Sequence, residues 1–279
     1  MSTHTAIWLD GAPAAALPLP DRGLDFGDGL FETLLLQRGQ PLYTDLHWGR
    51  MLRGLQVLGF PDCLGAAREQ LAAAARAVQS RGWHWAVIRL SVTRGAGPRG
   101  YAPPLAATAR IIISVTELER DCLLMQAPAA LSVAQVRWPT QPLLAGIKHL
   151  NRLEQVLASA EYRAAGADET VMLNQSGHVI SVAAGNLFTV QGGQISTPAL
   201  LDCGIAGTRR RRLMETWAPA IGCTVKESTI TLQDLRAADE VFYSNSLQGL
   251  RPVASLGETR WSSHPVCDAL FQQYRGEQV

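Results

Sequence analysis

The stretch Gly146-Ile147-Lys148-His149-Leu150-Asn151-Arg152-Leu153-Glu154 is the most informative part of this 279-residue chain. A lysine follows a short Gly- and Pro-containing loop and precedes apolar residues at helical spacing. A lysine amine can bond covalently to an aldehyde cofactor. Taken alone, a lysine at such a place is most often an ordinary surface residue. The surrounding sequence must therefore decide what Lys148 does.

Several short motifs lie on either side of this stretch. A glycine-rich segment covers residues 21–33, and a loop rich in Gly and Pro covers residues 94–104. The motifs that follow are Ala167-Asp168-Glu169-Thr170-Val171-Met172-Leu173, Gly185-Asn186-Leu187-Phe188, Thr197-Pro198 and Gly204-Ile205-Ala206-Gly207-Thr208-Arg209.

Composition limits the class of protein. A net charge of +1 gives no electrostatic case for binding nucleic acid or an anionic membrane, and 47% hydrophobic residues indicate a globular chain. The five cysteines include no Cys-x-x-Cys pair and the six histidines lack metal-ligand spacing, so we expect no metal site. The start, residues 1–10, lacks a signal-peptide pattern, and no stretch reaches the ~20 apolar residues of a spanning helix. We expect a cytoplasmic protein with reduced thiols.

Periodicity predicts two α/β halves, the second richer in strands. Strict alternation predicts a strand over residues 85–93, and Asp45 is expected to cap a helix that ends near Gly59. Thr231 and Asp234 are expected to form a short capping box. Leu150, Leu153, Leu157 and Ala160 form an apolar stripe on another expected helix. We expect a smaller N-terminal α/β domain over residues 1–118 and a larger strand-rich domain over 119–279 that carries Lys148. Further strands are expected at 109–116, 131–138, 169–173, 178–182, 186–190 and 240–246, and further helices over 65–81, from Gly207 to Pro219, and from His264.

This ordered set of motifs resembles the branched-chain aminotransferase superfamily of pyridoxal-phosphate enzymes, from Asp21 to Val253. The resemblance implies the mixed α/β, two-domain architecture of fold type IV, with the cofactor pyridoxal 5'-phosphate in the cleft between domains. It also implies a homodimer with a small-molecule substrate. Lys148 matches the lysine that binds the cofactor covalently and then moves protons as general base and acid.

For the cofactor phosphate, the resemblance points to an arginine, a helix start and a hydroxyl. Arg50, in His47-x-x-Arg50-Met51, matches the family arginine and can hold two phosphate oxygens. Backbone N–H groups at a helix start favour an anion. Here the chain has Gly-Thr-Arg where relatives often have Gly-Ile-Thr. The remaining phosphate candidates are Gly207, Thr208, Arg209 and Ser246. The basic run at residues 209–212 is otherwise typical of a solvated helix face.

Ser181 departs from the family pattern. Most relatives carry a glutamate five residues before the Asn of Asn-Leu-Phe, where it keeps the pyridine nitrogen protonated. A serine hydroxyl cannot compensate that charge. Three explanations stay open: serine suffices for this reaction, a carboxylate such as Glu154 or Glu169 substitutes, or the activity is lost or changed.

The substrate candidates favour the lyase branch of the superfamily, whose members convert 4-amino-4-deoxychorismate to 4-aminobenzoate and pyruvate in folate biosynthesis. The stretch 149–155 and the loop with Arg99, Gly100 and Tyr101 carry this resemblance. Arg99 can pair with a substrate carboxylate. Phe31 and Asn245 complete the expected substrate contacts. A branched-chain or D-amino-acid aminotransferase, and a non-catalytic relative with Ser181, remain the alternatives.

Overall fold

The computed structural model describes residues 5–278. Residues 1–4, part of the stretch inspected for a signal peptide, and residue 279 lie outside the described residues. The chain forms two compact units: unit 1 is Met1–Asp121 with Ile147–Asn151, and unit 2 is Cys122–Gly146 with Arg152–Val279. Lys148 thus groups with unit 1, whereas we expected it in the C-terminal domain. The domain limits at residues 118 and 119 stay a prediction.

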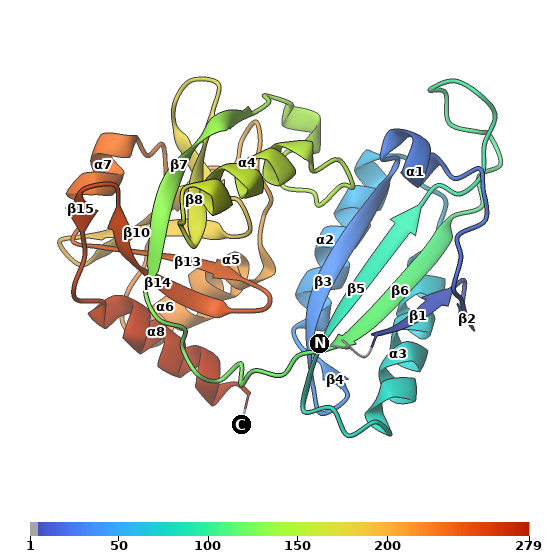
Figure 1. The fold of residues 1–279 in the computed structure, drawn as a ribbon, viewed down its shortest axis with the longest axis horizontal. Helices are drawn as coiled ribbons and strands as arrows, with labels where there is room; N and C mark the ends of the chain where they lie inside the picture. The colour runs from blue at the N-terminus through green and yellow to red at the C-terminus, as the bar shows by residue number, and fades with distance from the viewer. Residues whose placement is uncertain (1–4, 279) are drawn as a thin grey trace. The chain divides into compact units, whose positions relative to one another are not determined.

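Unit 1 is an antiparallel sheet with helices packed on it (Figure 1). Within the described residues the sheet has six strands in the order β2-β1-β6-β5-β3-β4. Helix α2 packs against β3, and α3 packs against β6. The strands are β1 (Thr5–Leu9), β2 (Ala12–Pro13), β3 (Gly29–Gln37), β4 (Gln40–Pro41), β5 (Trp85–Thr93) and β6 (Arg110–Glu117), and the helices are α1 (Arg22–Phe26), α2 (Thr44–Val57) and α3 (Leu64–Gln79).

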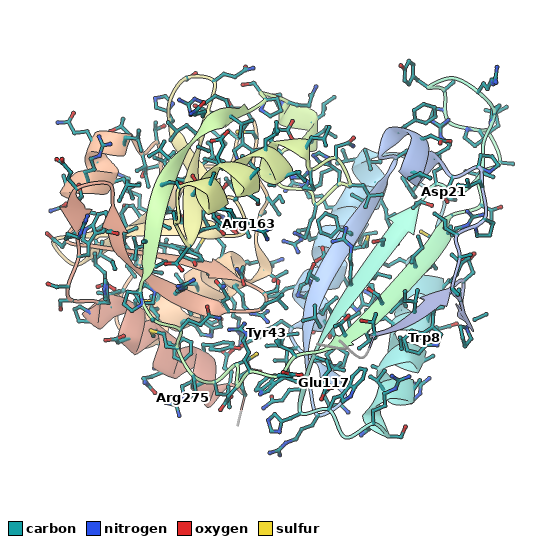
Figure 2. The ribbon with its side chains drawn as sticks, viewed as in Figure 1. Trp8, Asp21, Tyr43, Glu117, Arg163 and Arg275 are labelled. Carbon is teal, nitrogen blue, oxygen red and sulfur yellow. The ribbon has the colours of Figure 1, made fainter. Side chains whose placement is uncertain are left out.

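Local sequence accounts for most of these boundaries. The predicted strand over 85–93 is confirmed as β5, whose alternating side chains are buried. Asp21, labelled in Figure 2, caps α1 by accepting a hydrogen bond from the backbone N–H of Gly23. The expected cap of α2 was wrong, because the helix begins after Tyr43 and Asp45 lies in its first turn. In the first turn the negative Asp45 carboxylate still stabilises the helix, because it interacts favourably with the helix dipole.

Unit 2 is built on a mixed sheet of nine strands within the described residues, in the order β12-β11-β10-β13-β14-β7-β8-β9, with β15 paired to β14. β7 and β8 are parallel, so a crossover must join them, and residues 139–168 form it. The strands are β7 (Ala129–Trp138), β8 (Glu169–Asn174), β9 (Val179–Val182), β10 (Asn186–Gln191), β11 (Gln194–Pro198), β12 (Val225–Ser228), β13 (Glu240–Asn245), β14 (Gly249–Leu256) and β15 (Thr259–Arg260).

The helices of unit 2 are η1 (Pro142–Leu144), α4 (Leu153–Ala164), α5 (Thr208–Arg212), η2 (Leu213–Trp217), α6 (Ala218–Ala220), α7 (Leu232–Ala237) and α8 (Pro265–Gly276). The helix expected from Gly207 is confirmed, although its middle, η2, is a π-helix that the sequence did not predict. Thr231 and Asp234 form the expected capping box of α7.

Helix α4 exposes the apolar stripe that its spacing had suggested. Ala158 is buried against β7 and β8, while Leu153 is 74% and Leu157 is 55% exposed. Periodicity thus identified the helix, and the residue that it buries against the sheet is the small Ala158. Over residues 5–278, no helix is long and apolar enough to cross a membrane.

Candidate functional site

Lys148 is fixed by its backbone to the edge of β3. The backbone N–H of Phe31 donates to the Lys148 carbonyl at 2.9 Å, and the N–H of Leu150 donates to the Gly29 carbonyl at 3.0 Å. Leu30 and His149 form the antiparallel bridge between these bonds. Gly29 suits this edge because a Cβ there would lie 2.4 Å from the Val92 carbonyl oxygen. The segment of the lysine is therefore held to β3 by an isolated antiparallel bridge.

The Lys148 amine lies over the ring of Phe31, 4.3 Å from its centroid. The Arg89 guanidinium lies 4.1 Å from the same centroid, and burial lowers its pKa. A cation over an aromatic face is attracted by the ring quadrupole. Phe31, one of the expected substrate contacts, is thus the residue whose ring the Lys148 amine contacts.

Arg50 lies on α2 and contacts a carboxylate that the sequence did not single out. Its Nε donates to Glu32 at 2.8 Å, and Nη2 donates to the second Glu32 oxygen. His47 Nδ1 lies 2.6 Å from Glu32 as well. Burial alone would raise the pKa of Glu32, but Arg50 and His47 lower it to about 2. A phosphate would have to be bound by N–H groups of Arg50 other than these two, so its expected role stays a prediction.

The remaining phosphate candidates come together in unit 2. Gly207 is the N-cap of α5, and a Cβ there would lie 2.0 Å from Asn186 Oδ1, so only glycine fits. The Thr208 hydroxyl lies 3.5 Å from the Ser246 hydroxyl, and Arg209 Nη2 donates to the Ser246 carbonyl at 3.1 Å. Two hydroxyls beside a helix start are a donor set that suits a phosphate.

The other arginines of the basic run have acidic neighbours. Arg210 pairs with Glu227, Arg211 with Glu215, and Arg212 with Glu277. The interpretation of the run as a solvated helix face holds for Arg211, which is exposed, but not for Arg210, which is 8% exposed. Arg209, which is 1% exposed, is the member that contacts the Ser246 loop.

Ser181 lies on β9, is 4% exposed, and accepts a hydrogen bond from Trp138 Nε1 at 3.1 Å. Trp138 ends β7 and packs in the core beneath α4 with Ile180 and Ala158. Because the indole can only donate, it uses an acceptor site of the serine oxygen, and the serine proton is available to an acceptor. A serine in this state fits a neutral ring nitrogen better than a protonated one.

Glu169, one carboxylate considered as a substitute, is engaged with backbone groups. Its oxygens accept the N–H of Thr170 at 3.0 Å and of Ala184 at 3.2 Å, and burial raises its pKa. These contacts explain Glu169 as a structural group at the start of β8.

The expected substrate residues are spread over two loops. Arg99 and Tyr101 are exposed on the 94–104 loop of unit 1, with Tyr101 86% exposed. Asn245 lies in unit 2 and closes the β13–β14 turn, where its Oδ1 accepts the N–H groups of Leu247 at 3.0 Å and Gln248 at 2.8 Å.

Unit 1 therefore carries Lys148, Phe31, Arg50, Arg99 and Tyr101, and unit 2 carries Ser181, Gly207, Thr208, Arg209, Asn245 and Ser246. The sequence reasoning missed Glu32 and Trp138. Glu32 gave a weak signal, a carboxylate inside an otherwise apolar strand. Trp138 gave no signal, because a tryptophan at the end of a strand is normally interpreted as a core residue.

Comparison with known proteins identifies the family of this chain. The sequence matches the family model for amino-transferase class IV over residues 29–256. It is 36% identical over 252 residues to an aminodeoxychorismate lyase of Vibrio harveyi, and the aligned region covers 89% of this chain and 90% of that relative. A D-alanine aminotransferase of Listeria monocytogenes is 29% identical over 253 residues, covering 87% of this chain and 83% of the relative.

A solved structure extends the match to the fold. The crystal structure of 4-amino-4-deoxychorismate lyase from Pseudomonas aeruginosa superimposes with a TM-score of 0.87 at 39% identity, covering 97% of this chain and 98% of that one. The expected fold class, the α/β architecture of fold type IV, is confirmed. This chain belongs to the aminotransferase class IV family.

Proposed function

We propose that the protein is a pyridoxal-phosphate-dependent lyase that converts 4-amino-4-deoxychorismate to 4-aminobenzoate and pyruvate. The observation that carries the proposal is the similarity to two lyases of this name over nearly the whole chain, at 36% and 39% identity. Lys148, held at the edge of β3 with its amine over Phe31, is the residue for the covalent contact with the cofactor.

In this reaction Lys148 is the group that moves protons. Its amine takes the proton from the substrate carbon that bears the amino group, and a proton returns to the departing enolpyruvyl group, which leaves as pyruvate. The atoms of 4-aminobenzoate and pyruvate sum to those of the substrate, so neither water nor an oxidant is consumed. Pyridoxal phosphate, when bound, supplies an electron-withdrawing ring that stabilises negative charge on that carbon.

Thr208, Ser246 and the start of α5 are the proposed phosphate contacts, and Arg50 is a further one. Ser181 is the proposed partner of the ring nitrogen. Because Trp138 donates to its oxygen, Ser181 offers a proton and no negative charge. A carboxylate would favour a protonated ring. We infer that the ring nitrogen stays neutral here, which penalises transamination more than an elimination that expels its leaving group soon after deprotonation.

A coupled assay with lactate dehydrogenase tests the proposal. Purified protein with pyridoxal phosphate and 4-amino-4-deoxychorismate should release pyruvate. Lys148→Ala should abolish the release, while Lys226→Ala, which removes the exposed lysine of β12, should not. Wild-type protein that releases no pyruvate would refute the lyase activity.

The alternative is an aminotransferase, which the similarity to a D-alanine aminotransferase supports. Amino-group exchange between D-alanine or a branched-chain amino acid and 2-oxoglutarate, without pyruvate from aminodeoxychorismate, would favour it. In a protein with neither activity, Ser181 would mark a relative that has lost catalysis.

We also propose a homodimer that works in the cytoplasm. Leu153, Val156 and Leu157 form an apolar face on α4 and are 74%, 60% and 55% exposed. Contiguous exposed apolar residues commonly mark an interface, and a second copy of the chain is the occupant we propose. Light scattering should give twice the 30.2 kDa chain mass, and Val156→Asp should shift it to the monomer. The cysteines of the described residues are all free thiols, which supports a reducing compartment.

A further inference from the structure

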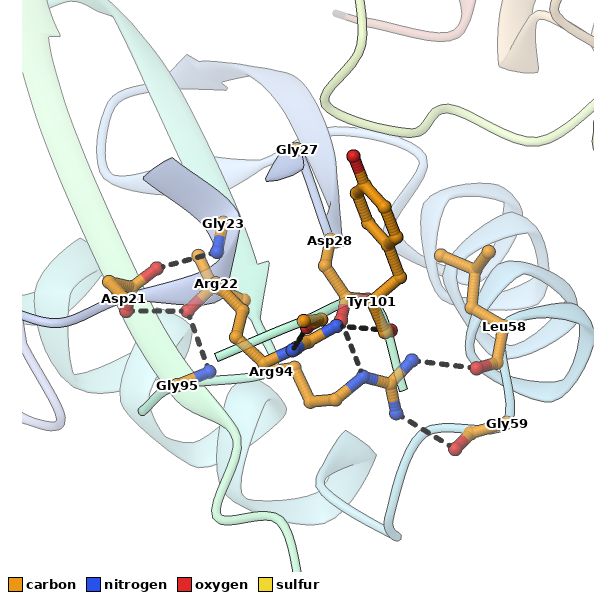
Figure 3. Close-up of polar contacts among 12 residues, drawn as sticks. Asp21, Arg22, Gly23, Gly27, Asp28, Leu58, Gly59, Arg94, Gly95 and Tyr101 are labelled. Carbon is orange, nitrogen blue, oxygen red and sulfur yellow. Dashed lines mark hydrogen bonds and ion pairs between the residues drawn. The ribbon is translucent and has the colours of Figure 1, made fainter. Parts of the chain in front are cut away.

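The side chain of Arg22 contacts the loop of residues 95–101, and Figure 3 shows it beside Asp28 and Tyr101. The backbone N–H of Arg22 donates to the Gly95 carbonyl at 2.8 Å. Its guanidinium donates from Nη1 to the Gly100 carbonyl at 3.0 Å and from Nη2 to the Tyr101 carbonyl at 2.8 Å. Arg22 is only 3% exposed although it lies in a short helix at the edge of unit 1.

Packing completes this arrangement. A Cβ on Gly97 would lie 2.7 Å from Arg22 Cδ, so the loop backbone passes directly over the arginine stem. The ring of Phe26 contacts both Arg22 and the loop: the guanidinium carbon lies 4.8 Å from its centroid, and the Tyr101 ring lies 5.4 Å away in an edge-on arrangement. Arg22 thus touches the loop near its beginning, middle and end.

The guanidinium is itself held by Asp28. Arg22 Nε donates to Asp28 Oδ2 at 2.9 Å, and this carboxylate is 13% exposed. A buried guanidinium paired with a carboxylate has a fixed orientation, so its two remaining edges present donors in fixed directions. The two loop carbonyls accept from these donors.

Arg94 provides a natural comparison within the same cluster. Its Nε donates to the same Asp28 oxygen at 2.7 Å, and its side chain, like that of Arg22, is 4% exposed. Its Nη atoms donate to the carbonyls of Gly59 at 3.0 Å and Leu58 at 2.7 Å, at the end of α2. The two arginines therefore share a partner and a bonding pattern but hold different segments.

We propose that Arg22 is the positioning residue of the substrate loop: it fixes the loop carbonyls at 100 and 101 and thereby presents Arg99 and Tyr101 to a dicarboxylate substrate. This rests on the proposed function for the identity of the substrate, but the control of the loop by Arg22 does not. Arg22 itself does not touch the substrate in this proposal.

Trypsin cleavage after Arg99 and steady-state kinetics test the proposal with Arg22→Lys and the matched control Arg94→Lys. Lysine keeps the charge beside Asp28, but one ammonium cannot span the carboxylate and two carbonyls. Arg22→Lys should be cleaved after Arg99 roughly tenfold faster, since the loss of one charge-assisted hydrogen bond is worth about this factor. Its KM should rise by a similar factor with kcat within about twofold, because the chemistry at Lys148 is untouched. Arg94→Lys removes contacts to Gly59 and Leu58 and none to residues 95–101, so both measurements should change clearly less than in Arg22→Lys.

The outcomes are distinct. Folded Arg22→Lys with wild-type cleavage at Arg99 overturns the proposal, as does equal acceleration in Arg94→Lys, which would indicate general loosening around Asp28. If Arg22→Lys does not fold, Gly97→Ala replaces it, since its methyl group would push the loop off Arg22 without changing a charge; unaltered cleavage and KM would then overturn the proposal. If wild type releases no pyruvate, the proposed function fails, and the cleavage rates alone decide the role of Arg22.

Discussion

The indole N–H of Trp138 donates a hydrogen bond to the hydroxyl oxygen of Ser181 across 3.1 Å, and both residues are buried. This pair stands where most relatives are expected to carry a glutamate. The indole N–H occupies one acceptor site of the serine oxygen, which leaves the serine proton for another acceptor. Trp138 and Ser181 therefore form one buried hydrogen-bonded pair in unit 2.

Replacing Ser181 should change both the spectrum and the reaction. Ser181→Glu should favour a protonated ring nitrogen, alter the visible absorption of the bound cofactor and raise amino-group exchange with 2-oxoglutarate. Absorption spectra and an exchange assay measure the two effects. An unchanged spectrum with an unchanged product ratio would remove Ser181 from the ring nitrogen.

Ser181→Ala should lower stability, because the buried Trp138 N–H loses its acceptor. The expected loss in unfolding free energy is about 1–3 kcal/mol. Trp138→Phe with Ser181→Ala removes both polar groups and should cost less than the sum of the single changes. Chemical denaturation of wild type, the two single variants and the double variant measures this coupling. Strictly additive changes in unfolding free energy would contradict the coupling.

Lys148 should carry the cofactor. Borohydride treatment of protein with pyridoxal phosphate, followed by peptide mapping, should place the reduced adduct on the peptide with Lys148. The other lysine of the chain, Lys226, is exposed and provides the internal control. Label on Lys226 alone, or no label, would contradict the assignment.

A test of Arg50 as a phosphate contact must separate its effect on cofactor binding from its effect on stability. Arg50→Ala alone leaves the buried Glu32 carboxylate with His47 but without its arginine partner. Such a change typically lowers the free energy of unfolding by about 3–5 kcal/mol. Arg50→Met combined with Glu32→Gln removes both charges and should restore much of that stability. Its affinity for pyridoxal phosphate should nevertheless stay well below wild type in a titration monitored by absorbance. Affinity equal to wild type would exclude Arg50 from the phosphate site.

Glu32 should make the protein sensitive to acid. Arg50 and His47 outweigh burial and lower the Glu32 pKa from 4.5 to about 2, so the ionised form stabilises the folded chain. That stabilisation is complete above the unfolded pKa and is lost as the pH falls from 4.5 towards about 2. It amounts to about 3 kcal/mol by linkage. Denaturation at several pH values measures the free energy of unfolding. This free energy should fall less steeply with decreasing pH in Glu32→Gln than in wild type, and equal slopes for the two proteins would contradict this account.

Sequence reasoning found the elements with strong periodicity and the residues with a family counterpart. β5 and the capping box of α7 follow from local rules, and both were predicted. The short strand pairing of Lys148 with β3 could not be predicted, because it joins residues more than a hundred positions apart without a local signal. The same holds for the Glu32 and Arg50 pair and for the loop that surrounds Arg22. Partners of buried charges depend on tertiary contacts, which a single sequence does not display.

Unit 1 is not a continuous piece of the sequence, and this affects how the protein can be made or divided. A ribosome has synthesised every strand of the six-stranded sheet by residue 117, yet the partner of the Gly29–Phe31 edge appears only thirty residues later. Until then the nascent chain presents unpaired backbone groups of the kind that recruit other strands. A truncated fragment ending at Asp121 would keep that edge permanently open, so expression of the first unit by itself should yield an aggregation-prone product.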